Sequence, residues 1–143
     1  MRIAISSCLC GCNVRYDGSN KFNPELFELI KDHELVPICP EQEAGFSVPH
    51  EALEISDGLV FTASGKDVSA QLESGCRCCL EKVKGCDFLI LKQKSPSCGK
   101  GKIYDGSFSG KLIKGDGVFA KLCLKEGLRV YSEEEIDAII KEL

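Results

Sequence analysis

Several features that would place this chain in a protein class are missing. No run of about 18 apolar residues occurs, so no membrane-spanning helix and no membrane partner are predicted. The first residues lack the apolar core and cleavage site of an export signal, and we expect a cytoplasmic protein. Neither GxGxxG nor GxxxxGK(S/T) is present, which removes the usual nucleotide-phosphate loops. A net charge of −4 gives no general attraction to nucleic acid.

Cysteine, by contrast, is abundant, with ten among 143 residues. In an exported protein this number would indicate a disulfide framework, but the cytosol keeps thiols reduced. A hydrophobic content of 43% suffices for a core without covalent staples. The cysteines therefore indicate metal, cluster or redox chemistry, with inert buried thiols as the alternative.

Strand-like and helix-like segments alternate along the chain. Apolar runs predict strands at 2–7, 35–39, 58–64, 86–92 and 128–131. Helical patterns cover 24–32, 67–84 and 118–126 and follow the capping box at 132–135. The stretch 42–56 reads as irregular, 65–66 as a hairpin turn and 99–117 as a glycine-rich loop. This alternation predicts a single Rossmann-like α/β domain over 1–143, with three layers, a mainly parallel sheet and helices on both faces.

Three cysteines directly follow predicted strands: Cys8, Cys39 and Cys98. The carboxyl ends of parallel strands meet at one edge of a sheet, so we expect these thiols to converge there. Three thiolates can hold a [4Fe-4S] cluster and leave its fourth iron open, whereas such clusters usually have four cysteine ligands. The alternative is that they are small apolar residues closing strand ends.

Polar groups stand beside these thiols in the sequence. Glu41 can serve as a general acid or base, or it can be a solvated loop carboxylate. Ser95 and Ser97 can hydrogen-bond a substrate or a cluster sulfide, or simply form a turn. Arg15 and Asp17 can orient a polar substrate or pair with each other.

Four motifs in order resemble one known family. They are Ser-Ser-Cys-Leu at 6–9 with Arg-Tyr-Asp-Gly at 15–18, Pro-Ile-Cys-Pro-Glu at 37–41, Lys-Ser-Pro-Ser-Cys-Gly at 94–99, and Tyr-Asp-Gly-Ser-Phe at 104–108 with Gly-Asp-Gly-Val at 115–118. Together they resemble the domain-of-unknown-function 523 (DUF523) family, which includes the TudS-type thiouracil desulfidases. The resemblance covers nearly the whole chain.

The resemblance implies an oxygen-sensitive [4Fe-4S] cluster on Cys8, Cys39 and Cys98. Its open fourth iron would take the sulfur of 2-thiouracil or 4-thiouracil, releasing uracil and sulfide in a non-redox reaction with the cluster as Lewis acid. The family's catalytic carboxylate corresponds to Glu41. Its catalytic serine lies in the Ser-Pro-Ser-Cys motif, which favours Ser95 over Ser97. His50 stands where a family arginine is often found and is a candidate to face the substrate. Free base, nucleoside and tRNA all stay open as substrates, as do monomer and homodimer.

The remaining cysteines are surplus to this pattern: Cys10, Cys12, Cys76, Cys78, Cys79, Cys86 and Cys123. Cys76 and Cys79 share a predicted helix face and could bind zinc, hold a second cluster, form a redox pair or merely pack. Cys10 or Cys12 could replace Cys8 or supply a fourth ligand, which would close the open iron. The main alternative function is therefore a non-catalytic metal or sulfur carrier.

Overall fold

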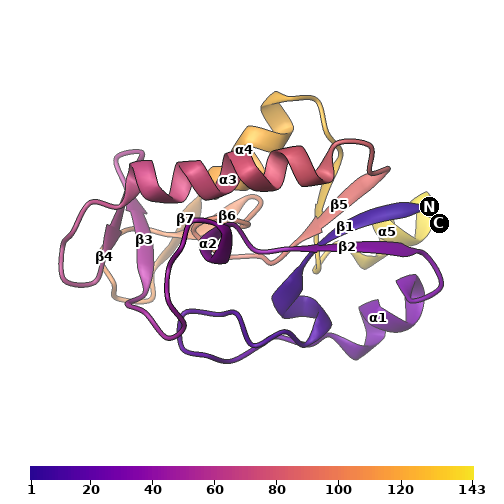
Figure 1. The fold of residues 1–143 in the computed structure, drawn as a ribbon, viewed down its shortest axis with the longest axis horizontal. Helices are drawn as coiled ribbons and strands as arrows, with labels where there is room; N and C mark the ends of the chain where they lie inside the picture. The colour runs from indigo at the N-terminus through magenta and orange to yellow at the C-terminus, as the bar shows by residue number, and fades with distance from the viewer.

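The computed structural model describes residues 1–143 and is built on a four-stranded parallel sheet (Figure 1). The strand order is β2-β1-β5-β8, and every neighbouring pair in it is parallel. Helices cover both faces of this sheet, with α3 and α4 on one side and α1 and α5 on the other. The predicted α/β class with a parallel sheet and helices on both faces is confirmed.

The elements in chain order are β1 (Arg2–Ser6), the 3-10 helix η1 (Ser7–Cys10), α1 (Pro24–Ile30), β2 (Glu34–Ile38), α2 (Pro40–Glu43), β3 (Leu53–Ser56), β4 (Leu59–Thr62), α3 (Ser69–Val83), β5 (Phe88–Leu91), β6 (Lys102–Tyr104), β7 (Leu112–Lys114), α4 (Val118–Lys125), β8 (Val130–Ser132) and α5 (Ile136–Glu142).

The central strand β5 explains the three layers. Its four side chains are fully buried. Successive side chains of a strand point to opposite faces. Accordingly Leu89 and Leu91 pack in the core beneath α3 and α4, while Phe88 and Ile90 pack in the core above α1 and α5. A strand buried on both faces reads as a continuous apolar run, which is the pattern at 88–91.

Helix α1 begins where its local sequence directs. The side chain of Asn23 accepts a hydrogen bond from the backbone N–H of Leu26 (3.1 Å), and Pro24 occupies the first helical position. Leu26 and Ile30 then lie on one face and are fully buried in the core shared with α5. The cap and the apolar stripe together fix this helix beneath the sheet.

Two short hairpins differ from the sequence expectation. The stretch predicted as irregular contains β3, which pairs antiparallel with β4 in a sheet of its own. The turn between β3 and β4 lies at 57–58, and the predicted turn at 65–66 is also present: it follows β4 and closes with an antiparallel bridge between Phe61 and Asp67. The predicted loop 99–117 contains the β6–β7 hairpin. The missed strands β3, β6 and β7 each mix two apolar residues with polar ones over three or four positions, so they give no continuous apolar run of the kind that marks β5. Both hairpins lie beyond the carboxyl ends of the main sheet (Figure 1).

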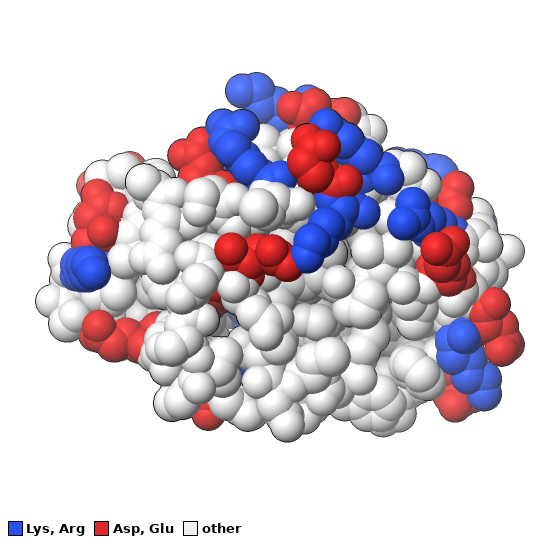
Figure 2. Space-filling model, viewed as in Figure 1, with Lys and Arg blue, Asp and Glu red and all other residues white.

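Charges of both signs are interspersed over α3 and α4, while the lower part of the same face is largely uncharged (Figure 2). No patch of a single sign dominates this view. None of the helices combines the length and apolar character needed to cross a membrane.

Candidate active site

A cavity of about 480 Å³ opens at the carboxyl ends of the central strands. Its floor consists of residues that follow β1, β2 and β5, the three adjacent strands of the main sheet. Leu53 and Glu54 of β3 and Tyr104 and Phe108 of the β6–β7 hairpin line the rest. The two hairpins thus enclose the edge of the sheet at which α/β proteins bind their ligands.

Three thiols reach this cavity from three adjacent strand ends. Cys39 follows β2, Cys8 lies in η1 after β1, and Cys98 lies in the loop after β5. Cys8 and Cys98 are buried, and Cys39 is half-buried. The structure therefore brings together three cysteines that are far apart in the sequence.

These thiols also influence one another's ionisation. Burial raises the pKa of Cys8 to about 12 and, as the largest cause in each case, also raises the pKa values of Cys39 and Cys98. Charge on Cys39 further raises the pKa of Cys8, and charge on Cys8 and Cys39 further raises the pKa of Cys98. Three bare thiolates would be unstable here, so their ionisation requires a compensating positive group such as a metal centre.

The donor set fits a cluster better than a single ion. No three His, Cys, Asp or Glu side chains converge closely enough to hold one metal ion. Cysteines of a [4Fe-4S] cluster bind separate irons, so their sulfurs surround the group rather than meet at one point. Ser7, next to Cys8, has a buried hydroxyl without a hydrogen-bond partner. Three separated soft donors with a spare hydroxyl nearby are compatible with an iron–sulfur group.

The loop that carries Cys98 is held by the start of α4. The carbonyl of Pro96 accepts from Val118 N–H (2.9 Å), and that of Ser97 accepts from Phe119 N–H (2.8 Å). These bonds satisfy helix N–H groups that have no partner within the helix. Gly117 lies against the same loop: a Cβ built there would be 2.6 Å from the carbonyl carbon of Ser97. The absence of a side chain at Gly117 therefore permits this close approach.

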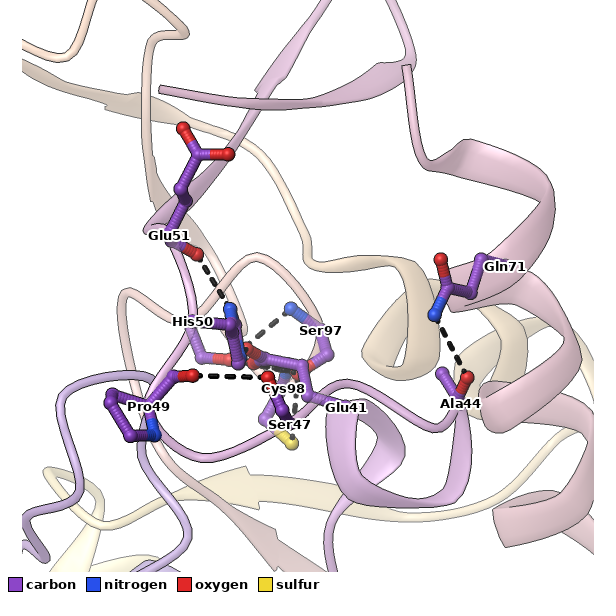
Figure 3. Close-up of polar contacts among 10 residues, drawn as sticks. Glu41, Ala44, Ser47, Pro49, His50, Glu51, Gln71, Ser97 and Cys98 are labelled. Atoms are coloured by element: carbon purple, nitrogen blue, oxygen red, sulfur yellow. Dashed lines mark hydrogen bonds and ion pairs between the residues drawn. The ribbon is translucent and has the colours of Figure 1, made fainter. Parts of the chain in front are cut away.

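A chain of polar contacts joins Glu41 to the loop (Figure 3). The Ser97 hydroxyl donates to Glu41 Oε2 (3.2 Å) and lies 3.0 Å from the Ser95 hydroxyl. Ser95 Oγ accepts from the backbone N–H groups of Ser97 (3.2 Å) and Cys98 (3.0 Å). Glu41, Ser95, Ser97 and Cys98 all line the cavity, so the carboxylate and both hydroxyls lie beside the Cys98 thiol.

Glycine 75 positions the helix that carries Glu41. Gly75 lies in the middle of α3, where glycine weakens a helix. A Cβ at this position would lie 2.2 Å from the carbonyl oxygen of Pro40 and 2.6 Å from the backbone nitrogen of Ala44. Helices α2 and α3 therefore pack backbone against backbone at this point. This contact explains why residue 75 has no side chain, and it fixes α2 beside the cavity.

The remaining predicted site residues separate into two groups. Arg15 lines the cavity and lies over the ring of Tyr16 at 5.8 Å. Asp17 lies outside the lining and accepts from the N–H of Ser19 (3.0 Å) and from its hydroxyl, which lowers the pKa of Asp17. It does not pair with Arg15. His50 also lies outside the lining, with Nε2 3.3 Å from Glu41 Oε1 (Figure 3).

Sequence reasoning did not single out the lysines of the cavity. Lys21, Lys92 and Lys94 line it together with Arg15, whereas Glu41 and Glu54 are its only acidic residues. Lys92 is paired with Glu133 at 3.0 Å. Lys94 adopts a positive φ of 68°, which is rare for a residue with a side chain. The available signal was that Lys94 begins the motif at 94–99 and that Lys92 shortly precedes it, whereas Lys21 carries no motif signal.

None of the surplus cysteines lines the cavity, although Cys79 lies next to Cys39, whose backbone N–H and charge both act on it. Cys10 is half-buried, and Cys12 is exposed. Cys76, Cys79 and Cys123 are buried together in the core between α3, α4 and the sheet. Burial raises the pKa values of Cys79 and Cys123 to about 12, so these thiols are protonated at neutral pH and pack as small apolar residues.

Comparisons with known proteins agree with this geometry. A family model described as 2-thiouracil desulfurase matches residues 3–135. The uncharacterized protein YbbK of Bacillus subtilis strain 168 is 41% identical over 150 residues, covering 96% of this chain and 99% of that protein. The solved structure of the [4Fe-4S]-dependent thiouracil desulfidase TudS matches with a TM-score of 0.89 and 35% identity, covering 96% of this chain and 93% of that one.

Proposed function

The chain belongs to the 2-thiouracil desulfurase family, and from this premise we propose that it is an enzyme that removes sulfur from thiolated uracil-type bases with a [4Fe-4S] cluster. The net reaction is a hydrolysis: a C=S group and water give C=O and hydrogen sulfide, with no net electron transfer. The observation that carries the proposal is the meeting of three thiols, two of them buried and one half-buried, with a carboxylate–serine chain in one cavity.

In this proposal, Cys8, Cys39 and Cys98 hold three irons and leave the fourth without a protein ligand. The position of Cys10 and Cys12 outside the cavity lining supports this assignment, because neither is placed to close the fourth iron. When bound, the cluster supplies a thiophilic Lewis acid for the sulfur of the substrate. A non-catalytic zinc carrier is less well supported, since no single-ion site of three such side chains exists.

Glu41 is the residue proposed to move protons. Its carboxyl group is 17% exposed and is held on both oxygens, by His50 on Oε1 and by Ser97 on Oε2. A carboxyl fixed in this way beside the cavity can protonate a ring nitrogen or deprotonate the attacking water. Ser97 is buried and donates to Glu41, so its hydrogen is already engaged.

Ser95 is the better candidate for contact with the substrate. It is only partly buried, and its oxygen accepts two backbone N–H groups. Its own hydrogen is therefore directed either to the Ser97 oxygen or to a ligand in the cavity. This geometry supports the assignment of Ser95 rather than Ser97 as the catalytic serine.

The cations of the cavity favour a substrate that carries negative charge. Lys92 is neutralised by Glu133, and Glu54 accepts from two backbone N–H groups of the β6–β7 hairpin. Arg15, Lys21 and Lys94 remain to attract an anion. Among a free thiolated base, its nucleoside and its nucleoside monophosphate, we expect the monophosphate to have the lowest KM. Thiouridine within tRNA belongs in the same comparison.

The test begins with protein reconstituted anaerobically with iron and sulfide. Incubation with 2-thiouracil and 4-thiouracil should abolish the thiocarbonyl absorbance and release one sulfide per base. Glu41→Gln should lower kcat about 10²- to 10⁴-fold, the usual contribution of a general acid or base. Glu43→Gln is the matched control, because Glu43 is in the same short helix but pairs with Lys82. A fully loaded protein that consumes none of these substrates would overturn the proposal.

A further inference from the structure

His50 lies behind Glu41, outside the residues that line the cavity. Its side chain is only 9% exposed. Nδ1 is 2.6 Å from the carbonyl oxygen of Glu51, and Nε2 is 3.3 Å from Glu41 Oε1 (Figure 3). The ring is flanked by Phe46 and Tyr16, with centroids 5.1 Å and 6.3 Å away. Both ring nitrogens therefore face oxygen atoms, and the aromatic neighbours limit rotation of the ring.

The two contacts determine where the hydrogens lie. A carbonyl oxygen only accepts, so the short contact to Glu51 requires a hydrogen on Nδ1. In a neutral imidazole, Nε2 would then carry only a lone pair, and an ionised Glu41 carboxylate beside it has no hydrogen to donate. Without a further hydrogen, Nε2 is a buried atom with no hydrogen-bond partner. A proton on Nε2 turns the same contact into a charge-assisted hydrogen bond.

We infer that His50 is a positioning residue for Glu41, a doubly protonated imidazole that holds Oε1 and leaves Oε2 for Ser97 and the substrate. The catalytic role of His50 rests on the proposed function. The hydrogen-bond arrangement of its ring is inferred from geometry alone. Because the ring is outside the cavity, His50 acts through Glu41 and does not touch the substrate.

The surroundings of the ring agree with a charged imidazole. Glu41 of α2 is the ionisable side chain whose hydrogen bond and charge act on it. Tyr16, from the loop before α1, presents its ring to His50, and the guanidinium of Arg15 lies 5.8 Å from the centroid of that Tyr16 ring. The hydrogen bond with Glu41 raises the pKa of His50 above its ordinary value, and burial opposes this shift.

The first test does not depend on activity. The chain contains two histidines, so ring 15N spectra of uniformly labelled protein contain two imidazoles. At pH 7.5, with and without the cluster, we expect both nitrogens of His50 to have the shifts of protonated nitrogens. His33, which lies at the surface beside the N-terminal amine, serves as the internal reference. A neutral His50 ring at this pH would overturn the inference.

The second test separates kcat from KM. His50→Ala should lower kcat roughly tenfold or more, since a misplaced catalytic group loses its alignment, while KM changes little. His50→Gln keeps an N–H donor near Oε1 and should recover most of kcat. Unchanged kcat in His50→Ala would refute the positioning role. If the wild-type protein consumes no thiolated base while the 15N pattern is found, the proposed function fails and the hydrogen-bond arrangement of His50 stands.

Discussion

Gly117→Ala should damage the thiol site without replacing any of its side chains. The backbone of Gly117 is extended, with φ −64° and ψ 161°, so alanine can adopt it without strain. In open space this change would stabilise the chain by about 0.4–1 kcal/mol, because alanine has less freedom when unfolded. Here the new Cβ would lie 2.6 Å from both the carbonyl carbon and the oxygen of Ser97, where ordinary contact begins at 3.4 Å.

The displacement needed is therefore roughly 0.8 Å, and it falls on backbone rather than on a flexible side chain. Hydrogen bonds from Gly117, Val118 and Phe119 to the carbonyls of the loop, 2.7–2.9 Å long, would lengthen together. At about 1 kcal/mol for each bond, we expect the free energy of unfolding to fall by about 2–3 kcal/mol. Because the loop carries Cys98, cluster content should also fall.

Urea unfolding of cluster-free protein and iron per chain after anaerobic reconstitution measure the two effects. Gly127→Ala at the other end of α4 is the control: Gly127 has φ +79° and no atom within 4 Å of a built Cβ. That variant should lose about 1 kcal/mol through its backbone conformation alone and bind iron normally. If Gly117→Ala is as stable as the wild type and binds the same iron, the close approach does not hold the loop.

Three further predictions follow from the same contacts. Gly75→Ala should push α2 away from α3 and so lower kcat. In reconstituted protein, the loss of bound iron should be smaller than in Gly117→Ala, and equal losses of iron in the two variants would contradict this. Cys98→Ser should abolish the visible absorption of the cluster, whereas Cys12→Ser should leave it unchanged. The reverse pattern would show that the cluster ligands have been assigned wrongly. The raised pKa of His50 predicts stabilisation that is fully present below about pH 6.5 and is lost as pH rises through the folded-state value. Wild-type and His50→Gln unfolding free energies should therefore converge at alkaline pH, and a constant difference would refute the ion pair.

Much of the fold could be predicted because its signals are local. The apolar run at 88–91 is long enough to indicate a buried strand, and Asn23 followed by Pro24 defines the start of a helix. A thiol that follows each of three strands places the candidate ligands at one edge once the sheet is known to be parallel. These predictions need only neighbouring residues and the general rule for strand ends.

What could not be predicted depends on contacts between distant segments. Gly75 reads as a weak point in a helix, and only the packed structure gives it a neighbour in Pro40. His50 reads as a residue facing the substrate, whereas it lies behind Glu41 because the chain returns there after α2. The difference between Ser95 and Ser97 likewise depends on which hydroxyl meets that carboxylate. The neighbours of these residues are set by tertiary contacts, which produce no periodic pattern in the sequence.

The dependence of the Cys98 loop on α4 has a consequence for the synthesis of the chain. Cys8 and Cys39 leave the ribosome early, but the loop that presents the third thiol is fixed only after residues 117–119 have emerged and donated their N–H groups. A nascent chain that ends before α4 therefore has no ordered three-thiol site to offer. Cofactor delivery is thus confined to a nearly completed chain. The synthesis of the start of α4 sets the earliest point at which the three thiols can accept iron.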